Sequence, residues 1–251
     1  MKKSNRQDEI LKLLKEDREV KVTELAIKFQ TSELTIRKDL NELYEKGKIH
    51  RVYGGATMLD TFEEPFLERK KKNSEEKNRI GQVASRLVND TDSIFIDNGT
   101  TTEHLAESLS HFTRLSVITT GLNIVNCLHH EENITVYVPE GRLDHRAFSI
   151  VGAQAEASLR KYMARMAFLG CDGLTIEQGI LYNSCESVAT SKILIENSQI
   201  KVLLCDSSKM GNIGSISLCP LTGVDIIITD NKITEEYKTS IEKSGVKLII
   251  V

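Results

Sequence analysis

The sequence has no apolar run that approaches the roughly 18–20 residues with which a helix crosses a bilayer. Residues 1–9 are polar and offer no apolar core for an export signal. None of the five cysteines forms a C-x-x-C pair or stands at metal-ligand spacing, which argues for reduced thiols and against a zinc site. We therefore expect a cytoplasmic protein without membrane contact, bound metal or cofactor.

Glycine-rich nucleotide signatures are absent as well. Neither G-x-G-x-x-G nor G-x-x-x-x-G-K-[ST] occurs, which argues against a nucleotide-binding regulator. The composition is that of a globular protein: 251 residues, 40% hydrophobic and 27% charged. The formal net charge of −3 is uneven, because residues 1–57 hold 13 Lys+Arg against 10 Asp+Glu, a balance of +3, which leaves −6 for the remainder. A polyanion is therefore expected to bind at the N-terminal part.

The N-terminal part has the pattern of three helices and a hairpin. Apolar residues within 6–16 predict a first helix, Thr23 is expected to cap a second helix over 24–29, and Ser32 a third over 33–46. In the third helix Ile36, Leu40 and Leu43 recur on one face and are expected to point inward. Residues 48–53, closed by two glycines, indicate part of a β-hairpin. This order is typical of a winged helix-turn-helix.

The third helix of such a domain lies in the major groove of double-stranded DNA. Arginine can pair with guanine through two hydrogen bonds, while lysine and threonine mainly hold phosphates. The alternative is a small helical domain whose charges are only solvated. The expected DNA-binding residues are Ser32, Thr35, Arg37 and Lys38, with Arg51 and Tyr53 on the wing.

Residues 58–73 are polar, contain Pro65 and include the basic run 69–72, so a linker is expected there. In residues 74–251 short apolar runs alternate with stretches of helical length, which predicts an α/β domain with a mostly parallel sheet. The predicted strands are 94–96, 115–118, 134–138, 166–169, 201–204, 225–228 and 246–250. The predicted helices include 123–129, 153–162 and 188–197.

The loop after the first of these strands reads Asp-Asn-Gly-Thr-Thr-Thr and leads into a helix. A helix N-terminus offers unpaired N–H groups and partial positive charge, so the loop suits a phosphate. Gly99 is expected to let the backbone approach the ligand and Thr100, Thr101 and Thr102 to donate to it. The alternative is that the threonines only cap the helix.

Polar residues also follow other predicted strands. Ligands of open parallel sheets bind beyond the carboxyl ends of strands, so these loops are expected to converge on one crevice. The candidate residues are Asp97, Thr119, Thr120, Asn123, Gly141, Arg142, Asp172 and Lys209, the last as the cation opposite the phosphate.

Two groups of motifs resemble the DeoR family of bacterial transcription regulators. Residues 32–43 and 47–56 resemble its DNA-binding domain, with Tyr53 in place of the usual histidine. Residues 97–101, 168–173 and 204–211, with Glu186 and Lys192, resemble its sensor domain. The departures are Thr120, where asparagine is common, and Glu140, where glycine is common.

The resemblance implies a winged helix-turn-helix over 1–57, a linker over 58–73 and, over 74–251, an α/β sensor domain similar to sugar-phosphate isomerases. It implies a phosphorylated sugar as effector, with Glu186 in its site. We expect a homo-oligomer, a dimer or a tetramer, that represses a carbohydrate operon by binding operator DNA. The alternative is a sugar-phosphate isomerase fused to a DNA-binding domain. Alignment of the isomerase base with Ser191, which cannot serve as a base, argues against catalysis, so no catalytic residue is expected.

Overall fold

The computed structural model describes residues 3–17, 19–45, 49–52, 54–58 and 66–251. The chain forms two compact units, Met1–Phe62 and Glu63–Val251, each of which is considered by itself. No helix in the described residues is long and apolar enough to cross a membrane.

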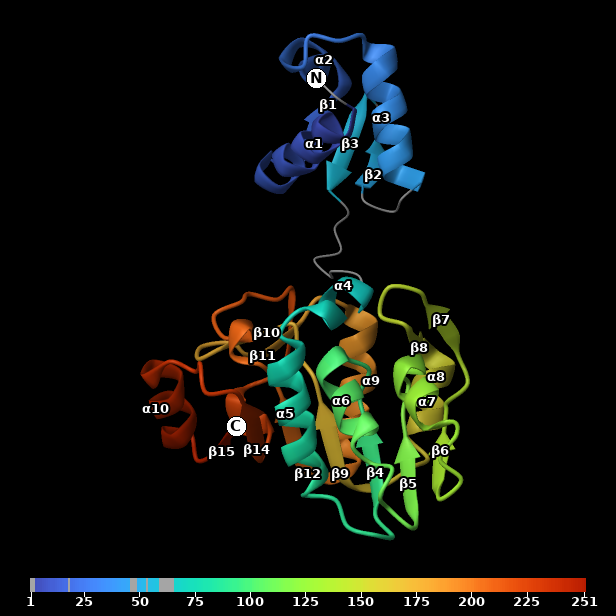
Figure 1. The fold of residues 1–251 in the computed structure, drawn as a ribbon, viewed down its shortest axis with the longest axis vertical. Helices are drawn as coiled ribbons and strands as arrows, with labels where there is room; N and C mark the ends of the chain where they lie inside the picture. The colour runs from blue at the N-terminus through green and yellow to red at the C-terminus, as the bar shows by residue number, and fades with distance from the viewer. Residues whose placement is uncertain (1–2, 18, 46–48, 53, 59–65) are drawn as a thin grey trace. The chain divides into compact units, whose positions relative to one another are not determined.

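The first unit contains three helices and a three-stranded antiparallel sheet in the order β1-β3-β2 (Figure 1). The elements are α1 (Lys3–Asp17), β1 (Glu19–Lys21), α2 (Val22–Lys28), α3 (Glu33–Glu45), β2 (Ile49–Val52) and β3 (Gly55–Met58). Gly54, at the turn between β2 and β3, has a φ of 78°, which favours glycine. The predicted helices and hairpin are confirmed, while Lys46 and Tyr53 lie outside the described residues.

The inward face of α3 is the predicted one. Ile36, Leu40 and Leu43 are buried and share a core with Ile10 and Leu14 of α1. Ion pairing strengthens this contact, because Arg6 Nε donates to Asp39 Oδ2 at 2.5 Å. The α1–α3 contact therefore combines apolar burial with a nearly buried charge pair.

The expected capping of the second helix by Thr23 is wrong. Helix α2 begins one residue earlier, at Val22, and Lys21 occupies the N-cap position without a side-chain hydrogen bond. Val22 is buried in the core of this unit, and its N–H donates to the carbonyl of Gly54. The helix therefore starts where tertiary contacts hold Val22, and not one residue later, where a capping threonine would have placed it.

The second unit is built on a parallel seven-stranded sheet in the order β15-β14-β12-β9-β4-β5-β6. Its strands are β4 (Ser93–Ile96), β5 (Leu115–Ile118), β6 (Ile134–Tyr137), β9 (Ala164–Leu169), β12 (Ser198–Leu204), β14 (Ile226–Thr229) and β15 (Lys247–Ile250). All seven predicted strands are confirmed. The apolar runs of β4, β9 and β12 are buried because helices cover both faces.

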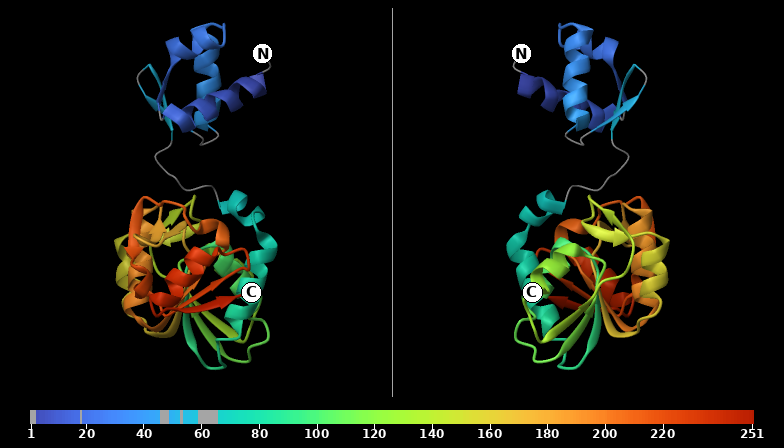
Figure 2. Two further views of the ribbon diagram at one scale, coloured as in Figure 1. Left: turned by 90° about the vertical axis from the view of Figure 1, so that its left-hand side faces the viewer. Right: turned by 90° about the vertical axis from the view of Figure 1, so that its right-hand side faces the viewer.

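Helices form a layer on each side of this sheet, as Figure 2 shows. One apolar core joins one face to α5 (Ser74–Ser85), α6 (Thr100–Glu107) and α7 (Leu122–Leu128). The other joins the opposite face to α8 (Ala153–Leu159), α9 (Cys185–Glu196) and α10 (Glu235–Lys243). Alternate residues of β4 divide between the two cores, with Phe95 in one and Ile94 and Ile96 in the other.

Two small antiparallel sheets, not predicted from the sequence, add to this unit. One pairs β7 (Arg142–Asp144) with β8 (Ser149–Val151), and the other orders β10 (Gly173–Thr175), β11 (Gly179–Tyr182) and β13 (Ile216–Cys219). The short 3₁₀ helices are η1 (Ser207–Lys209) and η2 (Leu221–Gly223). These elements lie in the segments that follow strands of the main sheet.

The linker expected over 58–73 differs from the structure at both ends. Met58 belongs to β3, and Phe66–Lys71 form a helix, α4, within the second unit. Phe66 is buried, and the fully buried Lys77 donates from Nζ to the carbonyl oxygen of Arg69 at 2.6 Å. Residues 59–65 lie outside the described residues, and the basic run belongs mostly to a packed helix.

Candidate DNA-binding helix and ligand-binding cleft

The outward face of α3 presents Arg37 and Lys38 to solvent. Arg37 Nη2 lies 3.3 Å from Glu33 Oε2, one turn earlier on the helix. Arg51 of β2 donates from Nη1 to the carbonyl of Arg37 at 3.4 Å. The wing and the third helix therefore gather two arginines on one surface, as a DNA contact requires.

Ser32 and Thr35 form the predicted cap. The N–H of Thr35 donates to Ser32 Oγ at 3.2 Å, and the two hydroxyls are 2.9 Å apart. Ser32 is exposed and Thr35 is half-buried, so these hydroxyls fix the start of the helix that carries the arginine. Tyr53, the remaining expected contact, lies outside the described residues.

The second unit has a cleft at the carboxyl ends of β4 and β9. Its walls are the loop and helix start 98–101, the loop 170–172, Arg69 of α4, Tyr182 of β11 and Ser187 of α9. The empty space, including the part open to solvent, is about 380 Å³. A helix start, an arginine and a carboxylate therefore line one opening at this edge of the sheet, where open parallel sheets bind their ligands.

The start of α6 forms one wall. Gly99, Thr100 and Thr101 line the cleft, and the first N–H groups of a helix have no partner within it. The φ of Gly99 is 176°, which any residue adopts, and a Cβ there would meet Thr102 Oγ1 at 3.1 Å. Gly99 is therefore not needed for the backbone conformation, and its lack of a side chain leaves space in the cleft.

Thr102 differs from the expectation. Its side chain is fully buried, and Oγ1 donates to the carbonyl oxygens of Asp97 at 2.7 Å and Gly99 at 3.1 Å. Thr102 follows Thr101 in the helix, and at this position the side chain points back to the end of β4. Thr102 therefore stabilises the loop and does not line the cleft. For this threonine, the alternative of a purely structural role at the helix start is the correct one.

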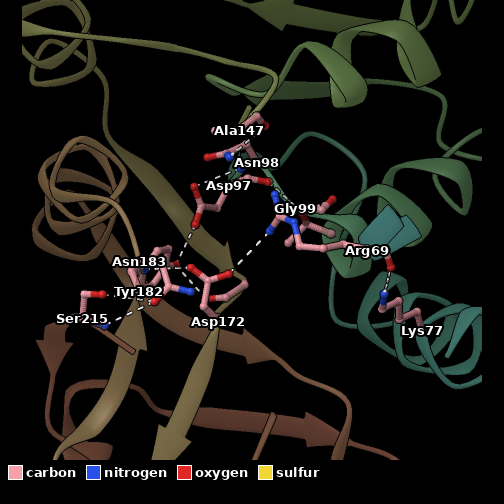
Figure 3. A network of polar contacts seen from close by, with 12 residues as sticks. Arg69, Lys77, Asp97, Asn98, Gly99, Ala147, Asp172, Tyr182, Asn183 and Ser215 are labelled. Atoms are coloured by element: carbon pink, nitrogen blue, oxygen red, sulfur yellow. Dashed lines mark hydrogen bonds and ion pairs between the residues drawn. The ribbon is translucent and has the colours of Figure 1, made fainter. Parts of the chain in front are cut away.

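Asp97 lies beneath the cleft. Its Oδ2 accepts a hydrogen bond from Tyr182 Oη at 2.8 Å, and its Oδ1 accepts one from the N–H of Asn98 (Figure 3). Oδ2 also accepts a hydrogen bond from Ser191 Oγ at 3.0 Å. Complete burial raises the pKa of this carboxyl to about 6, although the hydrogen bonds oppose the shift. Asp97 therefore ties the first loop to β11 and α9.

Arg69 supplies a positive charge to the cleft, next to the start of α6 (Figure 3). Figure 3 shows its side chain reaching toward Asp172 and the loop at Gly99. Its Nη1 lies 3.5 Å from Asp172 Oδ1, and the side chains are 12% and 11% exposed. The other oxygen of Asp172 accepts from the N–H of Asn183 at 2.9 Å. Asp172 was expected at this site, but Arg69 was assigned to the linker.

Thr119, Thr120 and Asn123 lie behind the cleft and do not line it. All three are buried. Asn123 Nδ2 donates to the carbonyl of Gly99 at 3.0 Å, and Thr119 Oγ1 accepts from the N–H of Gly121. Of the three, Asn123 therefore supports the loop that forms the cleft wall.

Four other candidates lie away from the cleft lining. Arg142 donates to both oxygens of Glu186 at 2.7 and 2.8 Å in an exposed pair. A Cβ on Gly141 would lie 2.8 Å from the carbonyl oxygen of Val151, so this glycine permits close packing against β8. Lys209 lies half-buried at the end of η1. The structure thus brings together Asp97, Gly99, Thr100, Thr101 and Asp172, and leaves these four outside the lining.

Sequence reasoning missed several lining residues. Asn98 and Cys171 stand inside recognised motifs, next to the ends of predicted strands, so their position was an available signal. Tyr182 gave none, because its strand, β11, was not predicted. Arg69 gave no such signal, because Pro65 and neighbouring lysines are typical of a solvated segment.

One cluster in the described part of the chain has the donor types of a metal site. Ligand atoms of Glu103, Glu107 and Cys127 lie within 4.8 Å of one another. Lys70 Nζ already binds Glu103 Oε1 at 2.9 Å, and burial together with the carboxylates raises the pKa of the Cys127 thiol to about 12. A neutral thiol beside an ammonium group is a poor cation site.

Comparison with known proteins accounts for both units. Residues 6–62 match the DeoR-like helix-turn-helix domain and residues 72–231 the DeoR C-terminal sensor domain. The HTH-type transcriptional regulator IolR of Bacillus subtilis is 32% identical over 87% of each chain. The glycerol-3-phosphate regulon repressor of Escherichia coli is 32% identical over 92% of each. The lactose phosphotransferase system repressor of Staphylococcus epidermidis is 32% identical over 94% of this chain and 95% of that protein.

Among solved structures, the chain resembles ribose 5-phosphate isomerase A from Methanocaldococcus jannaschii. The TM-score is 0.42 and the identity 20%, over 55% of each chain. Such a likeness carries no conclusion on activity. The two matched domains and the relatives aligned over most of their length establish that the chain belongs to the DeoR family of DNA-binding transcription regulators.

Proposed function

We propose that this protein represses a carbohydrate-utilisation operon and releases operator DNA when a phosphorylated sugar binds the cleft of its second unit. The observation that carries the proposal is the cleft itself, in which the start of α6 lies next to the guanidinium of Arg69. Unpaired N–H groups at a helix start and an arginine are both groups that bind phosphate. The names of relatives, two of which are repressors of sugar-related systems, point the same way.

Operator binding is assigned to α3 and the wing. Arg37, Lys38 and Arg51 are the cations of this surface, and Ser32 and Thr35 hold the helix start in place. Helix-turn-helix proteins commonly read two half-sites as dimers, so a dimer or tetramer in the cytoplasm is part of the proposal. Effector binding then acts by favouring the conformation with lower DNA affinity.

A thermal-shift screen of the full chain tests the effector. Phosphorylated sugars are compared with the same sugars lacking the phosphate. A ligand at 100 times its Kd stabilises the folded protein by about 2.7 kcal/mol, which is readily measured. Positive compounds are then added to gel shifts on the DNA upstream of the regulated operon. Stabilisation by the unphosphorylated sugars alone, or bound DNA that no stabilising compound releases, would contradict the proposal.

We also propose that the cleft binds its ligand without converting it, in place of the alternative of an isomerase. Sugar-phosphate isomerisation needs a carboxylate base at the sugar carbon. Ser191, at the position aligned with that base, donates its hydroxyl to Asp97, which is itself fully buried. Incubation with aldose and ketose phosphates and assay of their interconversion decides the matter, since turnover at enzyme-like rates would establish the isomerase.

A further inference from the structure

Side chains of helix α4 and of the residues after it contact several of the segments that surround the cleft. The ring of Phe66 lies 5.9 Å from that of Phe148, next to β8. Lys70 Nζ binds Glu103 Oε1 of α6 at 2.9 Å. Asn73 Nδ2 donates to Asp206 Oδ1 at 2.8 Å, in the loop after β12. A segment that reads as a linker in the sequence therefore spans three separate parts of the sensor unit.

Arg69 is the residue of this helix that enters the cleft. Its guanidinium faces the loop of Gly99 and pairs with Asp172 on the opposite wall (Figure 3). Their 3.5 Å separation is longer than the roughly 2.7–2.9 Å of a charge-assisted hydrogen bond. The pair is nearly buried, so screening by salt weakens it little. An anion that enters the cleft meets this guanidinium and competes with Asp172 for it.

Phosphate has two advantages over the carboxylate in this competition. It carries a larger negative charge near neutral pH, and its oxygens match the planar guanidinium through two parallel hydrogen bonds. The start of α6, which lines the same space, adds N–H donors and partial positive charge. Both groups can therefore hold one phosphate together.

We propose that Arg69 binds the phosphate of the effector in competition with Asp172, and that α4 thereby reports occupancy of the cleft to the chain leading to the DNA-binding unit. This rests on the proposed function, because it assumes a phosphorylated ligand. The main chain at Arg69 is tied to α5, because Lys77 Nζ donates to its carbonyl oxygen, so the guanidinium is carried by a helix that is packed on the sensor unit. Of the described residues, α4 is the first element after β3.

Four variants of the full chain test the assignment with inorganic phosphate as the probe. Affinity is measured as thermal stabilisation by sodium phosphate against sodium chloride at equal ionic strength. Arg69→Gln is expected to lose at least about tenfold in phosphate affinity, and Arg69→Lys, which keeps the charge without the planar fork, to lose less. Asp172→Asn is expected to bind phosphate several-fold more tightly, because the competing carboxylate is gone. Lys71→Gln is the matched control, since Lys71 is 73% exposed and pairs only with Glu68 in the described contacts.

The Asp172 variant separates binding from a structural role. If the pair only holds the fold together, Arg69→Gln and Asp172→Asn should both lower phosphate affinity, and that outcome overturns the proposal. Phosphate binding by Arg69→Gln equal to that of the parent overturns it as well, while the proposed function stands. Failure of the parent to respond to phosphate or to any sugar phosphate overturns the effector proposal and this inference with it.

Hydrogen–deuterium exchange tests the second half of the proposal. Phosphate is expected to change exchange in the peptide covering residues 66–71 of the parent and of Lys71→Gln, but not of Arg69→Gln. Protection confined to the start of α6, with exchange in α4 of the parent unchanged, would show that phosphate binds without involving α4. It would overturn the proposal that α4 reports occupancy of the cleft.

Discussion

The helices α3 and α6 begin with the same kind of small hydroxyl residue, yet their surroundings are opposite. Ser32, at the start of α3, is exposed, and Arg37 on the same helix is 49% exposed. Thr102 of α6 is fully buried, and Arg69 next to the start of that helix is 12% exposed. Burial, and not residue type, therefore separates the two candidate sites.

The degree of burial determines what each site can recognise. Exposed cations attract a polyanion through many weak contacts, so binding there falls steeply as salt rises. A guanidinium enclosed beside a helix start acts on one small anion at short range and is screened much less. Operator binding should therefore be far more sensitive to salt than effector binding.

Gly99→Glu should abolish the effector response and leave operator binding intact. The new carboxylate would occupy the cleft and repel the phosphate, and like charges brought together cost several kcal/mol, about 100-fold or more in affinity. The backbone at Gly99 accepts any residue. Gel shifts with and without the effector measure the response.

Two variants control for size. Gly99→Ala adds only a Cβ, 3.1 Å from Thr102 Oγ1, and should retain the response. Gly99→Gln matches the length of glutamate without its charge and should respond more weakly than the alanine variant but better than Gly99→Glu. Equal release of DNA by Gly99→Glu and the parent would show that the phosphate binds elsewhere.

Arg37→Ala should weaken specific operator binding by about 1–3 kcal/mol and leave the fold unchanged, because the side chain points to solvent. Fluorescence anisotropy on operator and on a scrambled duplex measures both affinities across a salt series. Lys12→Ala, which removes an exposed cation from α1, serves as the matched control. A variant that binds operator as well as the parent would contradict the assignment of α3.

Asp97→Asn should change how stability depends on pH. The native pKa of about 6 lies above the ordinary value of about 3.9, so between these values the folded state binds the extra proton and the free energy of unfolding falls as pH rises. The asparagine variant lacks this contribution. Its stability relative to the parent should rise by about 2 kcal/mol between pH 4 and pH 7, as measured by urea unfolding. A constant difference would mean that Asp97 titrates normally.

Lys209→Ala should have the smallest effect, less than about a twofold change in phosphate affinity. The side chain does not line the cleft, where Arg69 supplies the cation. A charge outside the lining acts on the phosphate only through a longer-range attraction, which salt screens. A loss as large as that of Arg69→Gln would restore Lys209 as the phosphate cation expected from the sequence.

Sequence patterns predicted two kinds of element. These are helices that begin at a capping residue and strands made of an unbroken run of buried apolar residues. Apolar runs marked all seven strands of the main sheet, and Ser32 marked the start of α3. Capping residues and apolar periodicity act within a few residues, so they are visible in one short stretch. The loop at Gly99 and the position of Asp172 followed from the same patterns, because parallel strands end at one edge of the sheet.

What escaped prediction depends on contacts distant in the chain. Helix α4 has six residues, too few to be stable alone, and it is held by Phe66 and by the Lys77 contact to its backbone. Ile180 of β11 pairs with Cys219 of β13, far along the chain. Which of three consecutive threonines turned inward could not be read from their identity either, since only the carbonyls at the end of β4 distinguish Thr102.

The pairing of β4 with β9 also determines when the two units can form during synthesis. Ile94 and Met166 are neighbours at the centre of the sheet, so the sensor core cannot close until the ribosome has passed β9. The described core and sheet of the first unit are complete once β3 has been made. At roughly 5–20 residues per second, the interval between the two events is on the order of 5–20 s. A nascent chain therefore carries a folded DNA-binding domain for some seconds before it has a sensor to regulate it.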